Sequence, residues 1–593
     1  MAGCDFFNQP PHTDTTVRPT IAVLPGADVN TIDPNDPYAR TAQIFPRLDE
    51  SMIDTARHYG VEQDFQADTL LYARGERAVC FFVIVAGTVE VFDLDASGQP
   101  VVFATHTHGQ FTGELDLLNQ REVLVYARAA AGTRVIKIER DALKRMLAAE
   151  PDIAEIVMRA LILRRVGLIQ NGTGGVLIVG GAHDAATLAL QRFLTRNGYP
   201  HRLVDTSDAG AEDQVLEGMG MSAERLPVVI FPDQTALSRP STAELADRLG
   251  LTEAFDGSLV YDVVVVGAGP SGLAAAVYAA SEGLNTIVIE GLAPGGQAGT
   301  SSRIENYLGF PTGISGQALA GRAHIQAQKF GARLAISRFV RSLECDEHPF
   351  RLELEDGEEV RTHAIVVATG ARYRKLSAVN YERFEGSGVH YAATPMEGKL
   401  CQGQEVIVVG GGNSAGQAAV FLSRTASMVH LLVRADGLAA TMSNYLIERI
   451  AHSARITLHV QSEIVRLDGD DHLETVACRH RDTGEVVVHP VGNVFVMIGA
   501  DPNTDWLGDC VGIDAKGFVE TGRACAGVPA TSPYATSRPG IFAVGDVRSG
   551  SVKRVASGVG EGSAVIQAVH EYLASIRHDS MPAAVPASPT VMA

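Results

Sequence analysis

Short apolar runs separated by glycines dominate residues 41 to about 140 of this 593-residue chain. Runs of five or six residues rich in Val, Ile and Phe, bounded by turn formers, are typical of β-strands. They predict a small N-terminal β-barrel or jelly-roll-like sandwich. Helical periodicity follows from Arg140 to about Gln170, and Asn171–Gly175 has the composition of a linker. The strand-forming runs are Cys80–Val85, Thr88–Phe92, Val101–Thr105 and Arg134–Ile138.

Apolar strands then alternate with helix-forming segments. Residues 175–252 contain three strand-like runs and three helical stretches, which predict a compact α/β unit. From residue 258 to about 575 the alternation resumes in a pattern that predicts two Rossmann-like folds. Residues 1–40 and 576–593 lack periodicity and are rich in Pro and in polar or small residues, which predicts an N-terminal arm and a disordered tail. The fold class is therefore multidomain.

A glycine-rich turn follows the apolar strand Tyr261–Val266 and opens an alanine-rich helix. In such a turn the first glycine allows a tight bend, the second lets the backbone approach a pyrophosphate, and the third lets helix and strand pack closely. Glu290 ends the next strand, where a carboxylate can bind ribose hydroxyls. The pattern predicts a dinucleotide site made by Gly267, Gly269, Pro270, Ser271, Gly272 and Glu290.

A second turn of the same kind begins 143 positions further on, after the strand Val406–Val409. The strand that follows it ends at an arginine rather than a carboxylate, which favours NADPH, through its 2′-phosphate, over the alternative NADH. Two dinucleotide sites in one chain indicate hydride transfer between them, and therefore a flavoenzyme. The residues predicted to bind NADPH are Gly410, Gly412, Asn413, Ser414, Ala415 and Arg434.

The composition excludes several classes of partner. The formal net charge of −20 opposes binding to nucleic acid or to an anionic membrane. No apolar run reaches the roughly 18 to 20 residues that span a bilayer. The seven cysteines include no CxxC pair, so the sequence predicts neither a disulfide framework nor a metal site, and it favours a reducing cytoplasm.

Four further segments occur in an order that is specific to one known family. With the first glycine turn, they resemble the low-molecular-weight thioredoxin reductases over residues 258 to about 575. The resemblance implies an FAD-binding domain at 258–378 and 492–575, an inserted NAD(P)H-binding domain at 379–491, and a homodimer. The segments are Pro294–Gln297, Ile304–Phe310, Val366–Ala371 and Gly540–Val547. The flavin-binding residues that the resemblance adds are Gly296, Gln297, Asn306, Thr369, Gly370 and Asp546, with Lys553, Arg554 and Val555 near the pyrimidine edge.

The segment that carries the redox cysteines in that family contains no cysteine here. Counting back from Gly410 places it at Ala393–Met396, followed by Glu397. Alanine and methionine cannot exchange a disulfide, so a thioredoxin-reductase relay lacks its reactive groups. Glu397 keeps a carboxyl group where the family has an acid, and it is either a catalytic proton relay or an ordinary solvated residue. Cys401 could act alone, although a single buried thiol is more often a packing residue.

The two N-terminal modules also resemble known domains. Residues 41–170 are similar to a cyclic-nucleotide-binding domain, and residues 175–252 to a thioredoxin or glutaredoxin, with Leu226–Val228 at its cis-proline turn. The thioredoxin-like module has no cysteine at Gly181–Ala185, where its CxxC would fall, so a docking or spacer role is expected. A ligand-free docking role is the alternative for the first module. Its candidate cyclic-nucleotide residues are Gly113, Glu114, Leu115 and Arg121.

Three functions stay open at the level of the sequence. The first is an FAD-dependent NAD(P)H oxidoreductase whose reduced flavin passes electrons directly to an acceptor: a ferredoxin- or flavodoxin-type protein, a quinone, a small molecule or dioxygen. A nucleotide bound to the N-terminal module would regulate it. The second is a flavin and nucleotide sensor with little turnover. The third is a disulfide reductase that borrows cysteines from a partner.

Overall fold

The computed structural model describes residues 41–579, apart from 78, 95–98, 114–116, 118–120, 172–174, 207–224, 234, 253–254, 256, 302, 387, 471 and 523–531. The predicted arm at 1–40 and residues 580–593 of the predicted tail lie outside this range. The prediction of a tail is wrong for residues 576–579, which belong to the helix Val555–Asp579. The chain divides into two compact units. The first contains residues up to Leu117 together with Val123–Gly174, and the second contains Leu118–Glu122 together with everything from Gly175 onward.

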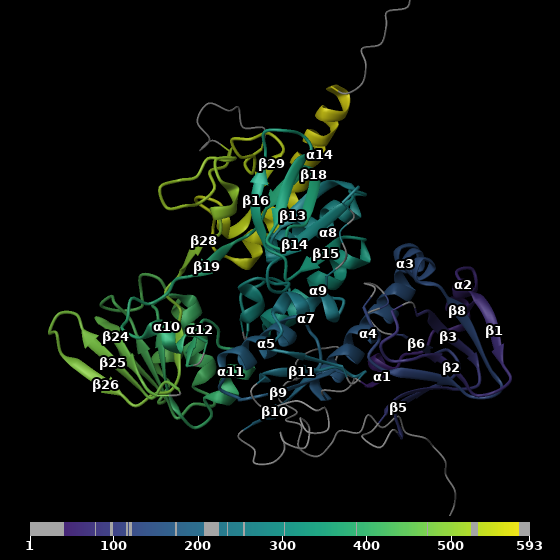
Figure 1. The fold of residues 1–593 in the computed structure, drawn as a ribbon, viewed down its shortest axis with the longest axis horizontal. Helices are drawn as coiled ribbons and strands as arrows, with labels where there is room; N and C mark the ends of the chain where they lie inside the picture. The colour runs from purple at the N-terminus through teal and green to yellow at the C-terminus, as the bar shows by residue number, and fades with distance from the viewer. Residues whose placement is uncertain are drawn as a thin grey trace, which may run out of the picture. The chain divides into compact units, whose positions relative to one another are not determined.

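The first unit is built on two four-stranded antiparallel sheets, with strand orders β1-β8-β3-β6 and β2-β7-β4-β5 (Figure 1). Its core is apolar, with Phe81, Phe111 and Ile136 fully buried. This confirms the predicted jelly-roll-like module and its terminal helices. The strands are β1 Val61–Phe65, β2 Thr69–Tyr72, β3 Phe81–Ala86, β4 Val89–Leu94, β5 Pro100–His106, β6 Phe111–Thr112, β7 Tyr126–Ala129 and β8 Thr133–Ile138. The helices are α1 Thr41–Ile44, α2 Glu50–Arg57, α3 Arg140–Ala149 and α4 Pro151–Asn171.

The second unit begins with the thioredoxin-like module, a four-stranded mixed sheet of order β10-β9-β11-β12. Strands β10 and β9 are parallel, whereas β11 is antiparallel to both of its neighbours. The Leu226–Pro227 peptide bond before β11 is cis, as the thioredoxin resemblance predicts. The elements are β9 Val176–Gly180, α5 Ala185–Arg196, β10 His201–Asp205, β11 Val228–Ile230, β12 Ala236–Ser238 and α7 Thr242–Arg248.

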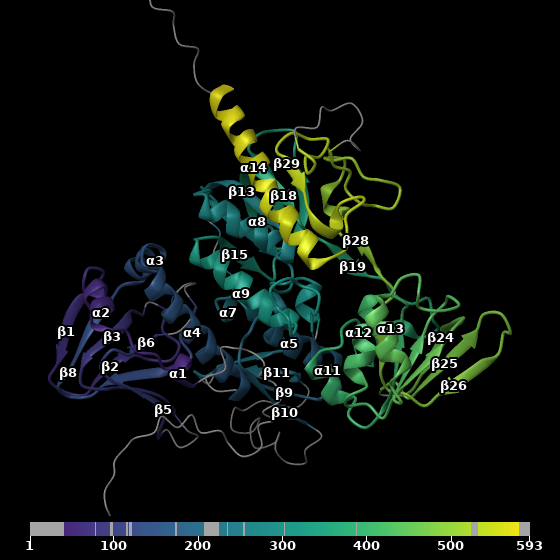
Figure 2. The same ribbon diagram turned by 180° about the vertical axis from the view of Figure 1, so that it is seen from behind.

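The first nucleotide domain follows, a seven-stranded sheet of order β15-β14-β13-β18-β17-β16 with β29 paired to β18. The central strand β13 is buried on both faces, which explains its continuous run of valines. The C-terminal helix α14 packs on α8 (Figure 2). The strands are β13 Val260–Val266, β14 Thr286–Glu290, β15 Arg333–Ile336, β16 Val340–Glu344, β17 Phe350–Leu354, β18 Glu359–Val367 and β29 Ile541–Ala543. The helices are α8 Pro270–Ser281, η4 Ala298–Thr300, α9 Gly316–Lys329, η5 Asp505–Leu507, η7 Gly545–Val547 and α14 Val555–Asp579.

The second nucleotide domain is inserted between β18 and β29 of the first. It combines a parallel sheet of order β20-β27-β21-β22-β23 with an antiparallel sheet β24-β25-β26, and the ribbon β19-β28 connects it to the first domain (Figure 1). The strands are β19 Ala371–Tyr373, β20 Val389–His390, β21 Glu405–Val409, β22 Met428–Leu432, β23 Ile456–His459, β24 Ser462–Asp468, β25 Thr475–His480, β26 Val486–His489, β27 Val494–Val496 and β28 Ala500–Pro502. The helices are α10 Tyr381–Phe384, α11 Pro395–Leu400, α12 Asn413–Leu422 and α13 Asn444–Ala451.

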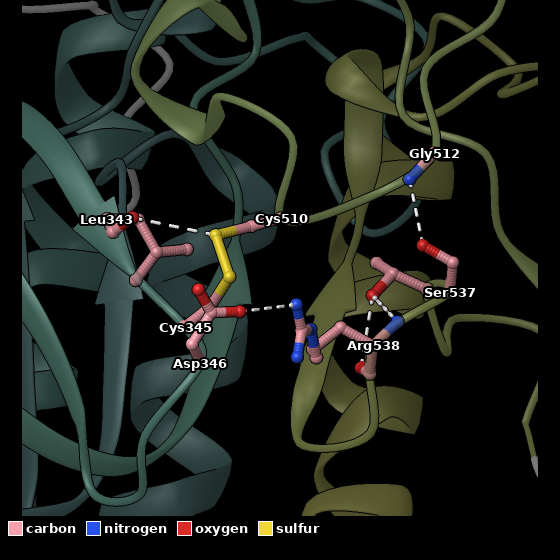
Figure 3. Close-up of a disulfide and its surroundings, with 8 residues drawn as sticks. Leu343, Cys345, Asp346, Cys510, Gly512, Ser537 and Arg538 are labelled. Carbon is pink, nitrogen blue, oxygen red and sulfur yellow. Dashed lines mark hydrogen bonds and ion pairs between the residues drawn. A yellow bond between two sulfur atoms is a disulfide. The ribbon is translucent and has the colours of Figure 1, made fainter.

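One expectation about sulfur is wrong. Cys345, which follows β16, and Cys510, which follows η5, form a disulfide (Figure 3). The two residues lie 165 positions apart, so their spacing gave no sign of the pair; only the return of the chain after the inserted domain brings them together. Both are buried in the core of the first nucleotide domain with Leu343, Leu507 and Val511. The argument from cysteine usage for a reducing compartment therefore does not hold.

Two features are absent from the described residues: a membrane-spanning helix and a cluster of metal ligands. No helix in them is both long and apolar enough to cross a membrane. Within the same ranges, no three His, Cys, Asp or Glu side chains gather in a way that could hold a metal ion.

Candidate active site

The first glycine turn has the geometry that the dinucleotide pattern requires. Gly267 has φ +104°, and a Cβ there would lie 2.4 Å from the carbonyl oxygen of Ala368. A Cβ on Gly272 would lie 1.8 Å from the carbonyl oxygen of Gly267, so the helix packs on backbone at this point. Gly269 is different, because a Cβ there would meet no atom within 4 Å. The backbone is therefore closed on the protein side and open where a pyrophosphate would lie.

Helix α8 presents its N-terminus to this open space. Gly269 is its N-cap residue and Pro270 its first residue, and no side chain caps its free N–H groups. Such groups bind phosphate oxygens well. Glu290 accepts hydrogen bonds from the N–H groups of Ala268 (2.7 Å) and Leu292 (2.9 Å), which fixes its carboxylate beside the turn. Ser271 is buried, and its hydroxyl faces Gly545, directly before Asp546, and Gly558 in α14.

The other predicted flavin segments lie around the same turn. Gly295 donates its N–H to the carbonyl of Ala268 (2.7 Å), and the side chain of Gln297 donates to the carbonyl of Ala371. Thr369 exchanges hydrogen bonds with Asn503, Oγ1 to the Asn503 carbonyl (2.7 Å) and Asn503 Nδ2 to the Thr369 carbonyl (3.0 Å). The structure thus brings segments 294–297, 369–371 and 503 to one edge of the sheet. Gly296 and Gly370 lie within these segments, and both have positive φ.

Asp546 lies in η7, directly after β29, as the resemblance implies. Gly545 donates its N–H to Glu561 (2.6 Å), and a Cβ on it would lie 2.2 Å from the hydroxyl of Ser271. The loop therefore sits against the N-terminus of α8. Burial raises the pKa of the Asp546 carboxyl, and the positive charge of Lys553 works in the opposite direction.

The remaining predicted flavin residues are less enclosed. Lys553 donates from Nζ to the carbonyl of Asp546 (2.5 Å) and lies 4.4 Å from the centre of the Phe518 ring. The side chain of Arg554 is exposed, and Val555 begins α14. Asn306 is exposed in the loop before α9. Lys553, rather than Arg554, is the cation held next to Asp546.

The second glycine turn repeats the design of the first. Gly410 has φ +143°, and a Cβ there would lie 2.3 Å from the carbonyl oxygen of Met497. Gly412 is the N-cap of α12, without a side-chain cap, and a Cβ on it would meet no atom within 4 Å. Ala415 is buried, whereas Ser414 is exposed at the mouth of the turn. Asn413 accepts a hydrogen bond from the N–H of Ser443 (2.7 Å) and so holds the turn to α13.

A second arginine, which the sequence analysis did not identify, lies near Arg434. Arg434 is exposed just after β22, and its carbonyl accepts a hydrogen bond from Nη1 of Arg481 (3.4 Å). Arg481 follows β25, 47 positions further along the chain. It lies outside the segment in which the family carries its arginines, so only the fold shows that these two residues are neighbours. Two guanidinium groups at this strand end suit a 2′-phosphate.

The segment that lacks the redox cysteines, 393–397, contacts the thioredoxin-like module through Glu397. Glu397, in α11, is only 2% exposed and forms an ion pair with Arg192 of the thioredoxin-like module (Nε to Oε1, 3.1 Å). Its other oxygen accepts a hydrogen bond from the N–H of Thr394 (3.1 Å). The reading of Glu397 as an ordinary solvated residue is therefore wrong. Cys401 is fully buried, and burial together with the charge of Glu397 raises the pKa of its thiol to about 12.

The cyclic-nucleotide candidates are only partly described. Glu114 and Leu115 lie outside the described residues. Gly113 has φ +152° and belongs to the first unit, whereas Arg121 is buried and belongs to the second. The structure does not bring these two residues together in one unit, and the cyclic-nucleotide site stays a prediction.

Both turns fit a bound dinucleotide, because each combines a tight first glycine, an uncapped helix N-terminus and free space in front of the second glycine. FAD at the first turn would be held by the α8 N-terminus, Glu290, the 294–297 segment and Asp546. NAD(P)H at the second would be held by the α12 N-terminus, Arg434 after β22 and Arg481 after β25. A fold with these two sites defines a flavin- and pyridine-nucleotide-dependent oxidoreductase.

Comparison with known proteins agrees with this class. The sequence profile described as "Pyridine nucleotide-disulphide oxidoreductase" matches residues 261–562, just over half of the chain, and the profile "Cyclic nucleotide-binding domain" matches residues 62–150. The thioredoxin reductase of Mycolicibacterium smegmatis is 34% identical over 315 residues, which are 53% of this chain and 97% of that protein. The chain belongs to the pyridine nucleotide-disulphide oxidoreductase family, as a thioredoxin reductase-like, FAD-dependent NAD(P)H oxidoreductase with an N-terminal cyclic nucleotide-binding domain.

Other relatives differ in length. The NADPH-dependent thioredoxin reductase 3 of Arabidopsis thaliana is 33% identical over 326 residues, which are 54% of this chain but only 59% of that protein. Among solved structures, the thioredoxin reductase of Lactococcus lactis aligns with a TM-score of 0.49 at 32% identity, over 53% of this chain and 99% of that one. The profile match over residues 261–562 and the sequence match to the Mycolicibacterium smegmatis protein confirm the predicted family.

Proposed function

We propose that this protein uses NADPH to reduce its FAD and that the reduced flavin passes electrons directly to an acceptor, without a disulfide relay in the second nucleotide domain. The observation that carries the proposal is the state of segment 393–401. It has no cysteine at the motif positions, and its one thiol, Cys401, is fully buried with a raised pKa. A thiol in that state is a poor nucleophile.

The Cys345–Cys510 disulfide does not replace that relay. Its sulfurs lie in an apolar core with Leu343 and Leu507, and Cys510 Sγ is 3.5 Å from the Leu343 carbonyl (Figure 3). They are not part of the loops that carry Gln297, Thr369 and Asp546. A disulfide that exchanges electrons with protein partners needs an accessible sulfur. This pair supports the fold.

The roles of the side chains follow from their positions. FAD, when bound, supplies the hydride-accepting and electron-releasing chemistry that no side chain has. The N–H groups of α8 and α12 bind the pyrophosphates, and Glu290 orients a ribose. Lys553 donates to the backbone carbonyl of Asp546 where the family approaches the flavin, and the cation would favour negative charge at that edge. Arg434 and Arg481 select NADPH by binding its 2′-phosphate.

The acceptor is a ferredoxin- or flavodoxin-type protein, a quinone or a small molecule, and a homodimer is the expected assembly. The cyclic nucleotide-binding domain supports regulation by a nucleotide. A sensor with little turnover is the second candidate, because the first module resembles a ligand-binding domain. A reductase that uses partner cysteines is disfavoured, because Arg192 covers Glu397.

Anaerobic rapid mixing of the purified full-length protein with NADPH tests the proposal. We expect the visible flavin absorbance to bleach within seconds and to return when an artificial acceptor such as ferricyanide is added. The Cys401→Ser variant should behave in the same way. No bleaching would favour the sensor. Brisk thioredoxin-coupled reduction of a disulfide dye would establish a disulfide reductase instead.

A further inference from the structure

Two segments carry cysteines in their respective families and carry none here, and the helices that follow them, α5 and α11, lie side by side in the second unit. In the thioredoxin-like module this segment is Gly181–Ala185, and in the second nucleotide domain it is Ala393–Met396. Helix α5 starts at Ala185, whose Cβ lies 3.7 Å from the position of a Cβ on Gly386. Figures 1 and 2 both show α11, which follows Thr394, beside α5.

A buried polar network joins α5 to the second nucleotide domain. From one turn of α5, Arg192 donates from Nε to Glu397 (3.1 Å) and from Nη2 to Nδ1 of His390 (2.8 Å). Because arginine can only donate, His390 must accept at Nδ1, so its proton is on Nε2, which donates to Oδ1 of Asn493 (2.8 Å). The His390 ring is 3% exposed. The network is complete at His390 and Glu397 only while Arg192 is in place.

The next turn of α5 binds the other nucleotide domain. Arg196 donates from Nη2 to the carbonyl of Gly296 (3.0 Å), in the segment expected beside the flavin. Asn197 donates to the carbonyl of Leu292 (3.2 Å), and Gln317 donates to the carbonyl of Thr195 (2.5 Å). Arg192 and Arg196 are four positions apart and therefore lie on one face of the helix. A single helix thus contacts both nucleotide domains.

The last helix of the module, α7, is anchored to the first nucleotide domain. In α7, Asp247 forms an ion pair with Arg338 (2.7 Å), and the hydroxyl groups of Thr242 and Ser337 lie 2.9 Å apart. The two nucleotide domains also meet directly through the ion pair Arg449–Glu305 (2.8 Å). A module fixed to the first domain that also holds His390 and Glu397 opposes any rotation of the second domain.

We propose that the cysteine-free thioredoxin-like module is an internal partner of the reductase. It covers the face around His390 and Glu397, which a protein disulfide would have to reach, and α5 clamps the second nucleotide domain to the first. Electrons therefore leave by another face, and the clamp opens during turnover. The turnover part of this proposal rests on the proposed function, whereas the docking part does not.

A designed crosslink tests the docking. In the Ala185→Cys, Gly386→Cys double variant, the two Cβ atoms would lie 3.7 Å apart, which is the usual separation in a disulfide. We expect this bond to form in air in the full-length protein, detected by peptide mapping without reductant. The control pair is Arg202→Cys with Gly386→Cys, because Arg202 is exposed on β10 of the same module. Gly386 has φ +85°, which strains a cysteine there, so the single Gly386→Cys variant must unfold at the same urea concentration as the wild type. No crosslink in the first pair with that fold intact, or equal crosslinking in both pairs, would overturn the proposal.

A second variant tests the network without new cysteines. Arg192→Glu places a carboxylate against Glu397, so we expect the amides of α11 to exchange with deuterium at least about tenfold faster, since opening then needs less free energy. Arg202→Glu is the matched control, and it should leave this exchange unchanged. Unaltered protection of α11 in Arg192→Glu would overturn the clamp, and so would equal loss of protection in both variants.

The crosslinked protein then tests the link to turnover. Steady-state NADPH oxidation with ferricyanide should be at least about tenfold slower when the bond is closed and should recover on mild reduction, since gating motions limit turnover in many enzymes. The wild type treated with the same reductant controls for the Cys345–Cys510 bond. Equal turnover of the closed and open forms would overturn the clamp. If the wild type itself fails to oxidise NADPH, the proposed function fails, and the crosslinking and exchange results still decide the docking.

Discussion

The two nucleotide domains share one design but are held together by different chemistry. In the first, a disulfide joins Cys345 and Cys510 across the insertion of the second domain. In the second, the described cysteines Cys401 and Cys478 are buried and free, and a polar network is completed by Arg192 from outside the domain. A covalent bond is insensitive to pH, whereas the network depends on a neutral imidazole. Sulfur therefore stabilises one domain, and charge controls the junction of the other.

The largest expected effect is loss of the covalent bond. The double variant Cys345→Ser, Cys510→Ser removes a link across 165 positions. Chain entropy gives such a link about 5 kcal/mol, and measured losses range from about 2 to 5 kcal/mol. We expect the urea midpoint of the first nucleotide domain, followed by flavin fluorescence, to fall by a corresponding amount. Cys401→Ser is the control, and an unchanged midpoint in the double variant would contradict the prediction.

A fall in pH should instead lower the stability of the second nucleotide domain and of its contact with Arg192 of α5. Burial and the charge of Arg192 lower the pKa of His390 from 6.5 to about 4, while Asn493 and Glu397 act in the opposite direction and His183 adds to the lowering. The unfolded chain therefore takes up this proton first. The stabilisation is complete above pH 6.5 and is lost as the pH falls toward 4, by about 3 kcal/mol in total.

The measurement is the deuterium exchange of α11 between pH 7 and pH 5, corrected for the intrinsic rate. His390→Gln keeps a donor and an acceptor without titrating, so its acid loss should be smaller. An equal loss in that variant would assign the effect to another group. The Cys345–Cys510 crosslink should be unaffected over the same range, which sharpens the contrast between the domains.

A smaller effect is expected at the second nucleotide site. Arg481→Ala should raise the KM for NADPH about tenfold, equivalent to about 1.4 kcal/mol, because one guanidinium is lost from the 2′-phosphate site. The KM for NADH should not change. Arg479→Ala is a matched control, since Arg479 and Arg481 both pair with Glu463 (2.6 and 3.8 Å) whereas Arg481 also donates to the carbonyl of Arg434. Equal changes for both cofactors would place Arg481 outside the site.

The smallest effect concerns the remaining thiol. Cys401→Ser should change NADPH oxidation by less than about twofold, because a thiol with a pKa of about 12 holds almost no thiolate at neutral pH. Iodoacetamide should likewise leave Cys401 unmodified in the native protein, as shown by peptide mass. Rapid alkylation together with loss of activity would restore the possibility of a sulfur relay.

Features with a local cause were predictable from the sequence. The turns at Gly267 and Gly410, and the strands before them, follow from residues within about ten positions, and the family resemblance supplied the position of Asp546. The long-range partners were not predictable in this way. Arg192 and Glu397 are 205 positions apart, and Cys345 and Cys510 are 165 apart. The disulfide depends on where the chain re-enters the first nucleotide domain after the insertion, and the Arg192–Glu397 pair depends on how two domains pack. No local sequence pattern encodes either.

Helix α14 has a consequence for biosynthesis. A Cβ on Gly562 would lie 2.0 Å from the carbonyl oxygen of Ser271, so the last described helix packs directly on the start of α8. Asp546, only a few residues before that helix, belongs to the same predicted FAD site at the start of α8. A ribosome must therefore translate at least as far as α14 before this cofactor site can close. Cofactor loading thus waits for α14, and chains truncated before residue 555 should emerge colourless.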